Sequence, residues 1–369
     1  GNADLWAGHV TWDEYRSMIR VVKYLDMPLP GVKVRRMAFT SNPGNLYSAD
    51  DFYNTDAGLT IIETSIQNFN HSAEGLVTPK TVFTWARAMV ANRLATNGDD
   101  WTELELRHQS GTCNNQWMVV DFKRFTPGEP LRDGTLWVSE AMPGYSRRED
   151  ATHTLVHQGS WPSFNIPYFK DIWVRGGYEE MENQAARSES WEYSFKKDPR
   201  GEMFERARRG RNVTSFDSFR GLLRYNNWHA DPLARGDACN GISARCDLNR
   251  KDLVQYDCFG AIDGKVVRYR KDSDDLSFLA VSSPSHDHYH GLEPFQWSAQ
   301  NDTVEGCRPS QHHGHPDTYN FGWYELPSTL QKTRASASLV AEQGPADRAP
   351  GVRGRGDVET EEGAGRLRA

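Results

Sequence analysis

The first 25 residues constrain the fold most, because they combine the end of a strand, a polar joint and the start of a regular apolar pattern. Residues 5–8 are typical of the end of a buried strand, and residues 11–14 (Thr-Trp-Asp-Glu) have the form of a capping box. Apolar residues then recur at helical spacing, which predicts an amphipathic helix over residues 13–25. We therefore expect His9 and Trp12 to lie where a strand meets a helix N-terminus.

A histidine at such a joint lies beside backbone N–H groups and the positive end of a helix dipole, so we expect His9 to stay neutral. This position suits a functional site. A histidine that only satisfies hydrogen bonds at a strand end is nevertheless the more common arrangement, and the pattern alone leaves both interpretations open.

Length and charge limit the class of protein. A chain of 369 residues allows one large domain or two average ones and can bury a full core. The net charge of −7, with basic and acidic residues intermixed, opposes binding to nucleic acid, and the one basic cluster, residues 206–211, is interpreted as a solvated helix end. No apolar run reaches the roughly eighteen residues of a membrane-spanning helix, so no transmembrane segment is predicted.

Strands and helices alternate along the chain. We predict strands at residues 32–40, 58–66 and 136–141, a strand fed by a polar turn within 110–123, and a return to the sheet within 266–279; helices running from Thr78-Pro79 to Leu94 and over 216–223; and loops at 161–168 and 231–249. Residues 328–369 contain no aromatic residue and are rich in Ala, Gly, Arg, Glu and Ser, which predicts a disordered tail. The pattern predicts one folded unit, residues 1–327, of the mixed, mainly antiparallel α+β class.

The cysteines and sequons concern the compartment. Five cysteines are an odd number, and their spacing does not form the paired pattern of a zinc site, so no metal framework is predicted. Three N-glycosylation sequons, at Asn70, Asn212 and Asn301, are compatible with a secretory route.

Two further constellations compete for a function. Six histidines gather near the C-terminal end, at His286, His288, His290, His312, His313 and His315, and alternate strand residues could share a face that binds a transition metal. No carboxylate or cysteine is spaced to complete a metal shell there, so we predict no metal site. A Ser-His-Asp hydrolase is conceivable, but the sequence lacks a Gly-x-Ser-x-Gly elbow that would single out one serine.

A third interpretation depends on a resemblance carried by long strings in a fixed order. These strings lie at residues 4–24, 48–53, 58–66, 110–121, 161–169, 224–227 and 242–249. Together they resemble the lysosomal phospholipase B-like family, and the similarity runs from about residue 3 to 327. The resemblance implies the N-terminal nucleophile hydrolase fold, a four-layer αββα sandwich in which two stacked, mainly antiparallel sheets lie between layers of helices.

The resemblance also implies a mechanism that needs no metal or organic cofactor. Autocleavage exposes a cysteine whose thiol attacks an acyl carbonyl and whose own α-amino group takes the proton. A free α-amine has a pKa of about 8, which is far closer to neutrality than the pKa of a lysine, so it can serve as the base for its own side chain.

Residue roles follow from the resemblance. It implies His9 and Trp12 in the pocket wall, Ser65 as a pocket hydroxyl where the family more often has Thr, Asn165 as the oxyanion-stabilising amide and Arg200 as a guanidinium that holds the α-amine region or an anionic group. Asn114 and Asn115 are weaker pocket candidates. The family's Cys-x-x-Cys pattern is altered here by Gly236, so if Cys239 is bridged we expect Cys246 as its partner.

One departure from the family concerns the nucleophile. By the resemblance, the attacking cysteine is expected shortly before Gly1, so the chain is expected to be a fragment that is inactive alone. Cys113 does not replace the missing residue, because an interior cysteine has no free α-amine.

We expect an acyl hydrolase, acting on lipid esters or N-acyl amides in the lysosome lumen or outside the cell. Its expected partners are the N-terminal fragment of the same precursor and, in a homodimer, a second copy. The alternative is a noncatalytic lipid- or glycan-binding protein that retains the pocket.

Overall fold

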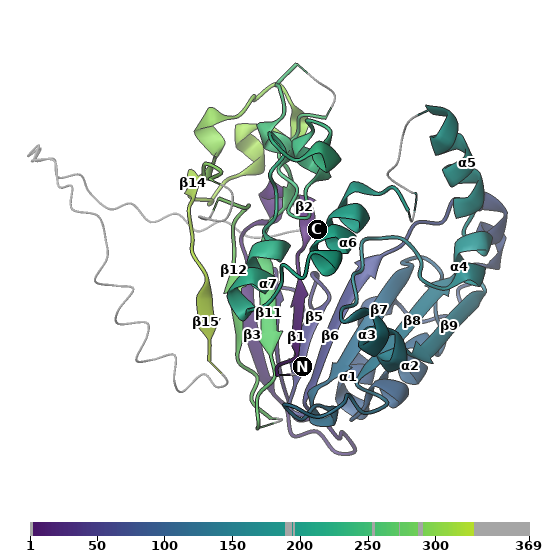
Figure 1. The fold of residues 1–369 in the computed structure, drawn as a ribbon. Helices are drawn as coiled ribbons and strands as arrows, with labels where there is room; N and C mark the ends of the chain where they lie inside the picture. Colours follow the sequence, from purple (N-terminus) through teal and green to yellow (C-terminus); the bar gives the residue numbers. More distant parts are fainter. Residues whose placement is uncertain are drawn as a thin grey trace, which may run out of the picture. The chain divides into compact units, whose positions relative to one another are not determined.

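The largest element is a seven-stranded antiparallel sheet whose strands pair in chain order (Figure 1). Its strands are β3 (Val21–Asp26), β4 (Arg36–Ser41), β5 (Phe52–Thr55), β6 (Leu59–Ser65), β7 (Asn115–Asp121), β8 (Leu136–Met142) and β9 (Tyr145–Asp150). The computed structural model describes residues 3–188, 194, 196–252, 255–272, 274–286 and 291–327.

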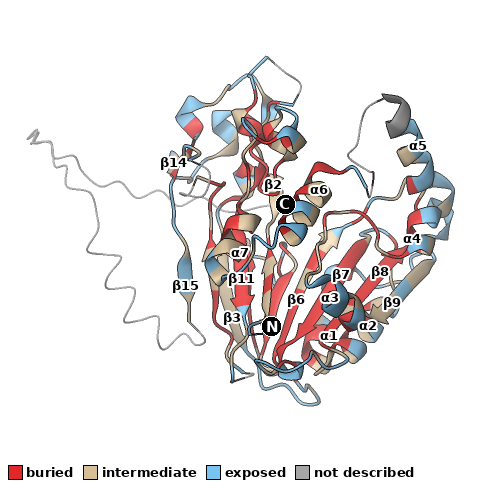
Figure 2. Cartoon of the chain, viewed as in Figure 1, coloured by how far each residue is buried: buried red, intermediate tan, exposed pale blue. Residues whose placement is uncertain are grey.

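Both faces of this sheet are buried, as Figure 2 shows for its central strands. Successive residues of a strand point to opposite faces. In β7, Trp117 and Val119 accordingly pack into one apolar cluster, while Met118 and Val120 pack into another. The sheet therefore needs a layer of structure on each side.

A second antiparallel sheet covers the inner face. It contains β1 (Trp6–His9), β11 (Gly264–Arg268), β12 (Phe278–Val281) and β15 (Tyr324–Leu326), in that order. Ala7 and Phe278 of this sheet share one core cluster with Phe52 and Met118 of the larger sheet, and the rings of Phe52 and Phe278 are 5.1 Å apart. The two sheets therefore pack face to face.

Helices lie on the outer face of each sheet. Helix α1 (Thr84–Leu94) and helix α2 (Gly98–Leu106) cover the larger sheet through Ala88, Ala91 and Trp101. Helix α7 (Phe216–Leu223) lies against β1, where Gly8 permits the contact because a Cβ there would lie 2.4 Å from Leu223. The described residues thus form an α+β fold with mainly antiparallel sheets, as predicted.

The remaining elements complete the unit. They are the strands β2 (Trp12–Glu14), β10 (Phe259–Ala261), β13 (Phe295–Gln296) and β14 (Thr318–Tyr319), the α-helices α3 (Thr152–Gln158), α4 (Lys170–Arg175), α5 (Tyr178–Ser188) and α6 (Pro199–Arg209), and the 3₁₀ helices η1 (Tyr15–Ser17), η2 (His71–Leu76), η3 (Phe122–Arg124), η4 (Pro232–Ala234), η5 (Ala238–Asn240), η6 (Cys246–Leu248), η7 (Trp297–Ala299), η8 (Glu305–Cys307) and η9 (Pro309–Gln311). Strand β2 pairs with β10, and β13 pairs with β14. Among the described residues, no helix is long and apolar enough to cross a membrane.

The predicted helix over residues 13–25 is wrong. The segment contains β2, the single turn η1 and strand β3. Its apolar residues serve different clusters, because Tyr15 and Met18 pack in one core while Val22 and Tyr24 pack against the core between the sheets. The helical spacing was therefore a coincidence of a bent segment, and Thr11 does not cap a helix.

Other predictions fared better. The strands predicted within 58–66, 110–123 and 136–141, the return to the sheet within 266–279, helix 216–223 and the loop at 161–168 are confirmed. Two elements begin later than predicted, since β4 starts at Arg36 and α1 starts at Thr84. The predicted disordered tail, residues 328–369, lies outside the described residues.

Candidate active site

Four predicted site residues form one chain of contacts, although they come from four distant parts of the sequence. The guanidinium of Arg200 lies over the ring of Trp12, at 4.7 Å from the ring centre. Arg200 Nη1 donates to Asn165 Oδ1 at 2.8 Å. Asn165 Nδ2 donates to the backbone carbonyl of Ser65 at 2.8 Å. The fold therefore brings Trp12, Ser65, Asn165 and Arg200 together.

Asn165 lies in the loop after α3 and has a left-handed backbone, with φ of 67°. Asparagine tolerates this conformation better than most residues, and such outliers concentrate at functional sites. The neighbouring Phe164 and Ile166 are buried and hold the loop from both sides. The buried carboxylate of Glu140 accepts a hydrogen bond from the backbone N–H of Tyr168 at 2.6 Å. Asn165, with its left-handed backbone, therefore lies in a loop that is held by buried neighbours and by Glu140.

Arg200 lies in the first turn of α6. Asp198 caps this helix by accepting hydrogen bonds from the backbone N–H groups of Arg200 and Gly201, at 2.8 and 3.1 Å. The same carboxylate pairs with the guanidinium at 3.2 Å, and the carbonyl of Phe164 accepts from Arg200 Nη2 at 3.0 Å. A Cβ on Gly201 would lie 2.8 Å from the Phe164 ring, so glycine allows α6 to approach the Asn165 loop.

His9 ends β1 and is buried. Its Nε2 lies 2.8 Å from the backbone carbonyl of Glu63, an acceptor, so Nε2 carries the hydrogen and Nδ1 carries a lone pair. No hydrogen-bond partner for Nδ1 occurs among the described residues. Burial, and then the nearby cation of Lys265, lower the pKa of His9 to about 3. The expectation of a neutral imidazole agrees with this, but its cause is not a helix dipole.

Ser65, Asn114 and Asn115 lie where β6 meets the start of β7. Ser65 pairs with Asn115 in the β6–β7 register, and the backbone carbonyl of Asn114 accepts from the N–H of Ile66 at 2.8 Å. The side chain of Asn115 donates to the carboxyl group of Glu63, whose pKa burial raises to about 7. The two asparagines therefore hold the strand end on which Ser65 is exposed.

Several ionisable groups beside the site were not predicted from the sequence, namely Glu63, Glu140, Asp263 and Lys265. All four are buried. The available signal was weak: Lys265 directly precedes the apolar pair Val266-Val267 within a strand, where a charge is unexpected.

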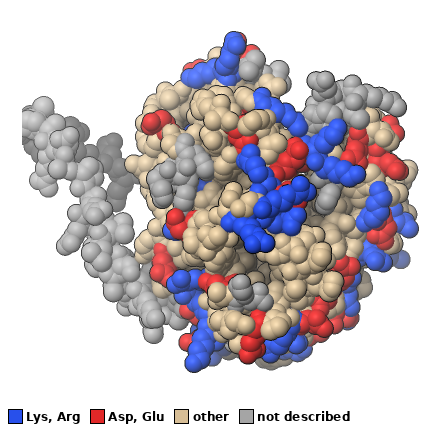
Figure 3. All heavy atoms as spheres, in the orientation of Figure 1, with Lys and Arg blue, Asp and Glu red and all other residues tan. Residues whose placement is uncertain are grey.

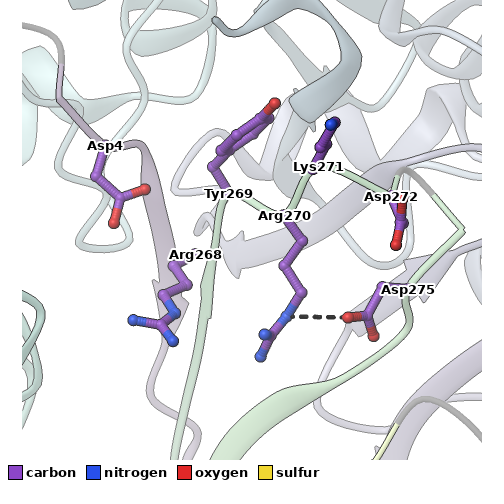
Figure 4. A pocket seen from close by; sticks show the side chains of 7 residues that line it. All are labelled: Asp4, Arg268, Tyr269, Arg270, Lys271, Asp272 and Asp275. Atoms are coloured by element: carbon purple, nitrogen blue, oxygen red, sulfur yellow. Dashed lines mark ion pairs between the residues drawn. The ribbon is translucent and has the colours of Figure 1, made fainter. Parts of the chain in front are cut away.

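Two hollows on the described part of the chain are not lined by the predicted site residues, except that Asn212 lines the smaller one. One, of about 450 Å³, lies at the end of β11 and contains the ion pair between Arg270 and Asp275 at 3.4 Å (Figure 4). The other, of about 240 Å³, lies between α6 and α7. Lys and Arg side chains gather over α6 on the face in Figure 3. The last turn of α6 contains Arg206, Arg208 and Arg209.

The cysteines form two bridges. Cys239 pairs with Cys246, and Cys258 pairs with Cys307, a bridge that the sequence analysis did not predict. Cys113 is a free, exposed thiol.

Metal ligands and sequons complete the survey of predicted sites. Within the described ranges, no group of three or more His, Cys, Asp or Glu side chains could hold a metal ion, and His288 and His290 lie outside those ranges. Of the sequon residues, Asn212 is exposed, whereas Asn70 and Asn301 are partly buried.

Comparisons with known proteins decide the family. A sequence model of the family described as Phospholipase B matches residues 1–326. The chain belongs to the phospholipase B family. This confirms the resemblance, which the sequence analysis placed over residues 3–327.

Curated relatives of this phospholipase B family chain come from distant organisms. "Phospholipase B-like protein B" of Dictyostelium discoideum is 39% identical over 323 residues, which cover 87% of this chain and 54% of that protein. "Phospholipase B" of Crotalus adamanteus is 33% identical over 332 residues, covering 89% and 56%, and "Phospholipase B-like 1" of Rattus norvegicus is 33% identical over 332 residues, covering 89% and 57%. The chain thus spans little more than half the length of these relatives.

Proposed function

We propose that this chain builds the pocket of a phospholipase B-like acyl hydrolase, which cleaves carboxylic ester bonds in lipids or N-acyl amide bonds. The observation that carries the proposal is the contact chain from Trp12 through Arg200 and Asn165 to Ser65. It brings an aromatic wall, a cation, an amide donor and a hydroxyl residue to one place. The family membership and the names of the relatives support ester hydrolysis as the reaction.

The proposed attacking group is the thiol of an N-terminal cysteine in a segment that precedes residue 1 in the full protein. The thiolate adds to the acyl carbonyl, and the α-amine of the same cysteine takes the thiol proton. The tetrahedral intermediate then expels the alcohol or amine, which leaves with a proton from the α-ammonium group. Water attacks the resulting thioester and releases the fatty acid. No metal or organic cofactor takes part in this mechanism.

Asn165 is the proposed oxyanion donor. Its Nδ2 carries two hydrogens, and one of them donates to the Ser65 carbonyl. The second hydrogen has no acceptor among the described residues, so it can point at a developing oxyanion. Such a donor is worth about 3 kcal/mol in the transition state. Arg200 donates to the amide oxygen, which fixes the orientation of the amide and leaves its nitrogen free to serve Ser65 and the proposed oxyanion.

His9 is proposed to stand beside the nucleophile. Its unpartnered Nδ1 is a hydrogen-bond acceptor in a buried position, which suits an N–H donor such as the α-amine of the cysteine. Because its pKa is lowered to about 3, His9 keeps that lone pair throughout the acidic range of a lysosome.

The proposed architecture is the αββα sandwich of N-terminal nucleophile hydrolases. Two observations support it: the face-to-face packing of the two sheets, and the helices on the outer face of each. The proposed location is the lysosome lumen or the extracellular space. Two disulfides and the exposed sequon at Asn212 suit an oxidising, glycosylating route.

The proposed partners are the N-terminal fragment of the same precursor and a second copy in a homodimer. A second candidate function is a noncatalytic lipid- or glycan-binding protein. The observation in its favour is that the guanidinium of Arg200 is already occupied by Asp198, Phe164 and Asn165. A site that satisfies its own polar groups can bind a ligand without turning it over.

Expression of the full-length protein separates the two functions. N-terminal sequencing and intact mass reveal whether a chain beginning with cysteine is released, and fatty-acid release from phosphatidylcholine and from an N-acylethanolamine reports ester and amide cleavage. The enzyme hypothesis predicts self-cleavage together with fatty acid from at least one substrate. An uncleaved protein that binds vesicles and releases no fatty acid would reject it in favour of the binding protein.

A further inference from the structure

Two chain segments leave the four-stranded sheet at the same point. β1 continues into β2, and β10 continues into β11, so residues 10–11 lie opposite residues 262–263 between two ladders. The backbone of Thr11 is held there on both sides. Its carbonyl accepts from the N–H of Ile262 at 2.9 Å, and its N–H donates to Asp263 Oδ1 at 2.9 Å. A carboxylate therefore replaces the missing strand partner.

We call this segment, residues 10–11 and 262–263, the Thr11 junction, and Lys265 also contacts it. Its side chain is fully buried, and Nζ donates to Thr11 Oγ1 and to Asp263 Oδ2, both at 2.6 Å. Asp50 lies 3.6 Å from the same nitrogen and also pairs with Arg20. Two buried cations and two buried anions thus balance each other around Thr11.

Thr11 lies between two of the predicted pocket residues. His9 ends β1, two residues before it, and Trp12 begins β2 directly after it. We propose that Lys265 and Asp263 are positioning residues for the candidate site, which fix the Thr11 junction so that His9 and Trp12 face the same pocket. This inference deepens the proposed function and depends on it for the identity of the pocket.

The chemistry of the junction favours positioning over stability. A buried ion pair costs desolvation free energy that its attraction barely offsets, and apolar residues of equal volume often stabilise a fold as well or better. Directional hydrogen bonds to the N–H and hydroxyl of one residue are what an apolar replacement cannot supply. The directional bonds of these charges therefore favour a role in geometry, at a place where the chain passes from one sheet to another between two site residues.

The same charges surround His9. Lys265 lies directly opposite it in the β1–β11 register, Asp263 and Arg20 contribute from the junction and from the segment after η1, and Glu63 of β6 supplies the backbone carbonyl at Nε2. Lys265 and Arg20 lower the pKa of His9, whereas Asp263 raises it. Loss of the lysine and loss of the aspartate should therefore have opposite effects on His9, although both disturb Thr11.

The test uses the full-length protein with the variants Lys265→Met, Asp263→Asn and Thr11→Val, the last of which removes only the hydroxyl acceptor. A matched control is Arg87→Met, which breaks the buried Arg87–Glu105 ion pair between α1 and α2. For each variant we would measure kcat and KM on the lipid that the full-length protein hydrolyses, the thermal stability, and the NMR titration of His9.

We expect all three junction variants to lower kcat about 10- to 100-fold, because small displacements of catalytic groups have effects of this size. We expect the His9 midpoint to move up by about one pH unit in Lys265→Met and not to move up in Asp263→Asn. Arg87→Met should lower thermal stability and leave kcat and the His9 midpoint unchanged. The inference is overturned if the junction variants behave like Arg87→Met, or if Lys265→Met and Asp263→Asn shift His9 alike.

The NMR readout also keeps the two proposals apart. If wild-type protein releases no fatty acid, the proposed enzyme function fails while the His9 titration still reports whether Lys265 and Asp263 control that side chain.

Discussion

The two faces of the seven-stranded sheet use polar residues in opposite ways. On the outer side, polar side chains of α1 and α2 bond to one another: Trp101 donates to Asn92 at 2.7 Å, and Arg87 pairs with Glu105. On the inner side, at the end of β6, the Asn165 amide donates one hydrogen to the Ser65 carbonyl, and its second hydrogen is proposed to serve a ligand. The outer side is thus interpreted as structural and the inner side as the proposed functional side, and the predictions below test that separation.

The largest expected effect concerns the outer face. Trp101 is fully buried against Trp117, with ring centres 5.1 Å apart. We expect Trp101→Ala to lower the free energy of unfolding by about 3–5 kcal/mol, because it leaves a large cavity. Urea unfolding measures this loss. Fatty-acid release per folded molecule should stay within about twofold, since small changes in geometry on this face do not reach the pocket; a selective loss of kcat in folded protein would break the comparison.

The second prediction concerns Arg200 on the inner side. A lysine cannot reproduce the planar fork that serves Asn165, Phe164 and Asp198 together, so we expect Arg200→Lys to lower kcat roughly 10- to 100-fold. The control is Arg209→Lys on the same helix, whose exposed side chain pairs with Glu205. Equal activity in the two variants would show that the charge, and not the fork, matters.

The third prediction concerns buried carboxyl groups, which occur on both faces. Burial raises the pKa of Glu63, Glu105 and Glu140 to about 7 each, from an ordinary value of 4.5. Between these values the unfolded chain releases protons that the folded chain keeps, so folding is favoured at low pH and stability falls as the pH rises from about 4.5 to 7. His9, with its pKa lowered to about 3, acts in the opposite direction up to about pH 6.5.

Burial also raises the pKa of Asp51 and lowers that of His315, so the carboxyl groups with a raised pKa still outnumber the imidazoles with a lowered one. We therefore expect the free energy of unfolding to be higher at pH 5 than at pH 7, by roughly 2–5 kcal/mol. Calorimetry at the two pH values measures the difference. The variant Glu140→Gln should reduce this pH dependence. A protein that is more stable at pH 7 than at pH 5 would contradict the prediction and weaken the proposed lysosomal location.

The smallest expected effect concerns the sequon at the exposed Asn212. We expect Asn212→Gln to remove one glycan from the secreted protein and to change stability by less than about 0.5 kcal/mol, as is usual for surface substitutions. Intact mass spectrometry and thermal unfolding measure the two quantities. An unchanged mass would show that the sequon is not used.

Local patterns in the sequence predicted four of the seven strands of the larger sheet, β4, β6, β7 and β8, and missed β3, β5 and β9. Residues 58–66 are rich in β-branched residues, and such a run is typical of a buried strand. The same kind of reasoning failed over residues 13–25, because apolar residues at helical spacing there belong to three short elements that pack in different clusters. A spacing rule assumes one regular element, and tertiary packing overrides it when the chain bends.

The candidate site could be predicted only through the family resemblance. No local pattern links Trp12, Ser65, Asn165 and Arg200, since their proximity arises from the packing of β2, β6, a loop and α6. The buried ion pairs of the Thr11 junction were out of reach for a similar reason. A lysine such as Lys265 is ordinarily exposed, and only the fold reveals that its charge is matched by Asp263.

The most direct test of the proposed site is the effect of Asn165→Ala on kcat and KM of the full-length protein, measured separately. An amide that contacts the oxyanion acts in the transition state, so the account predicts that kcat falls about 10²- to 10³-fold while KM changes little. The variant Asn165→Asp, which keeps an acceptor for Arg200 but loses the N–H donors, should lose turnover as well. A rise in KM with kcat unchanged in Asn165→Ala would contradict the account and identify Asn165 as a residue that only binds substrate.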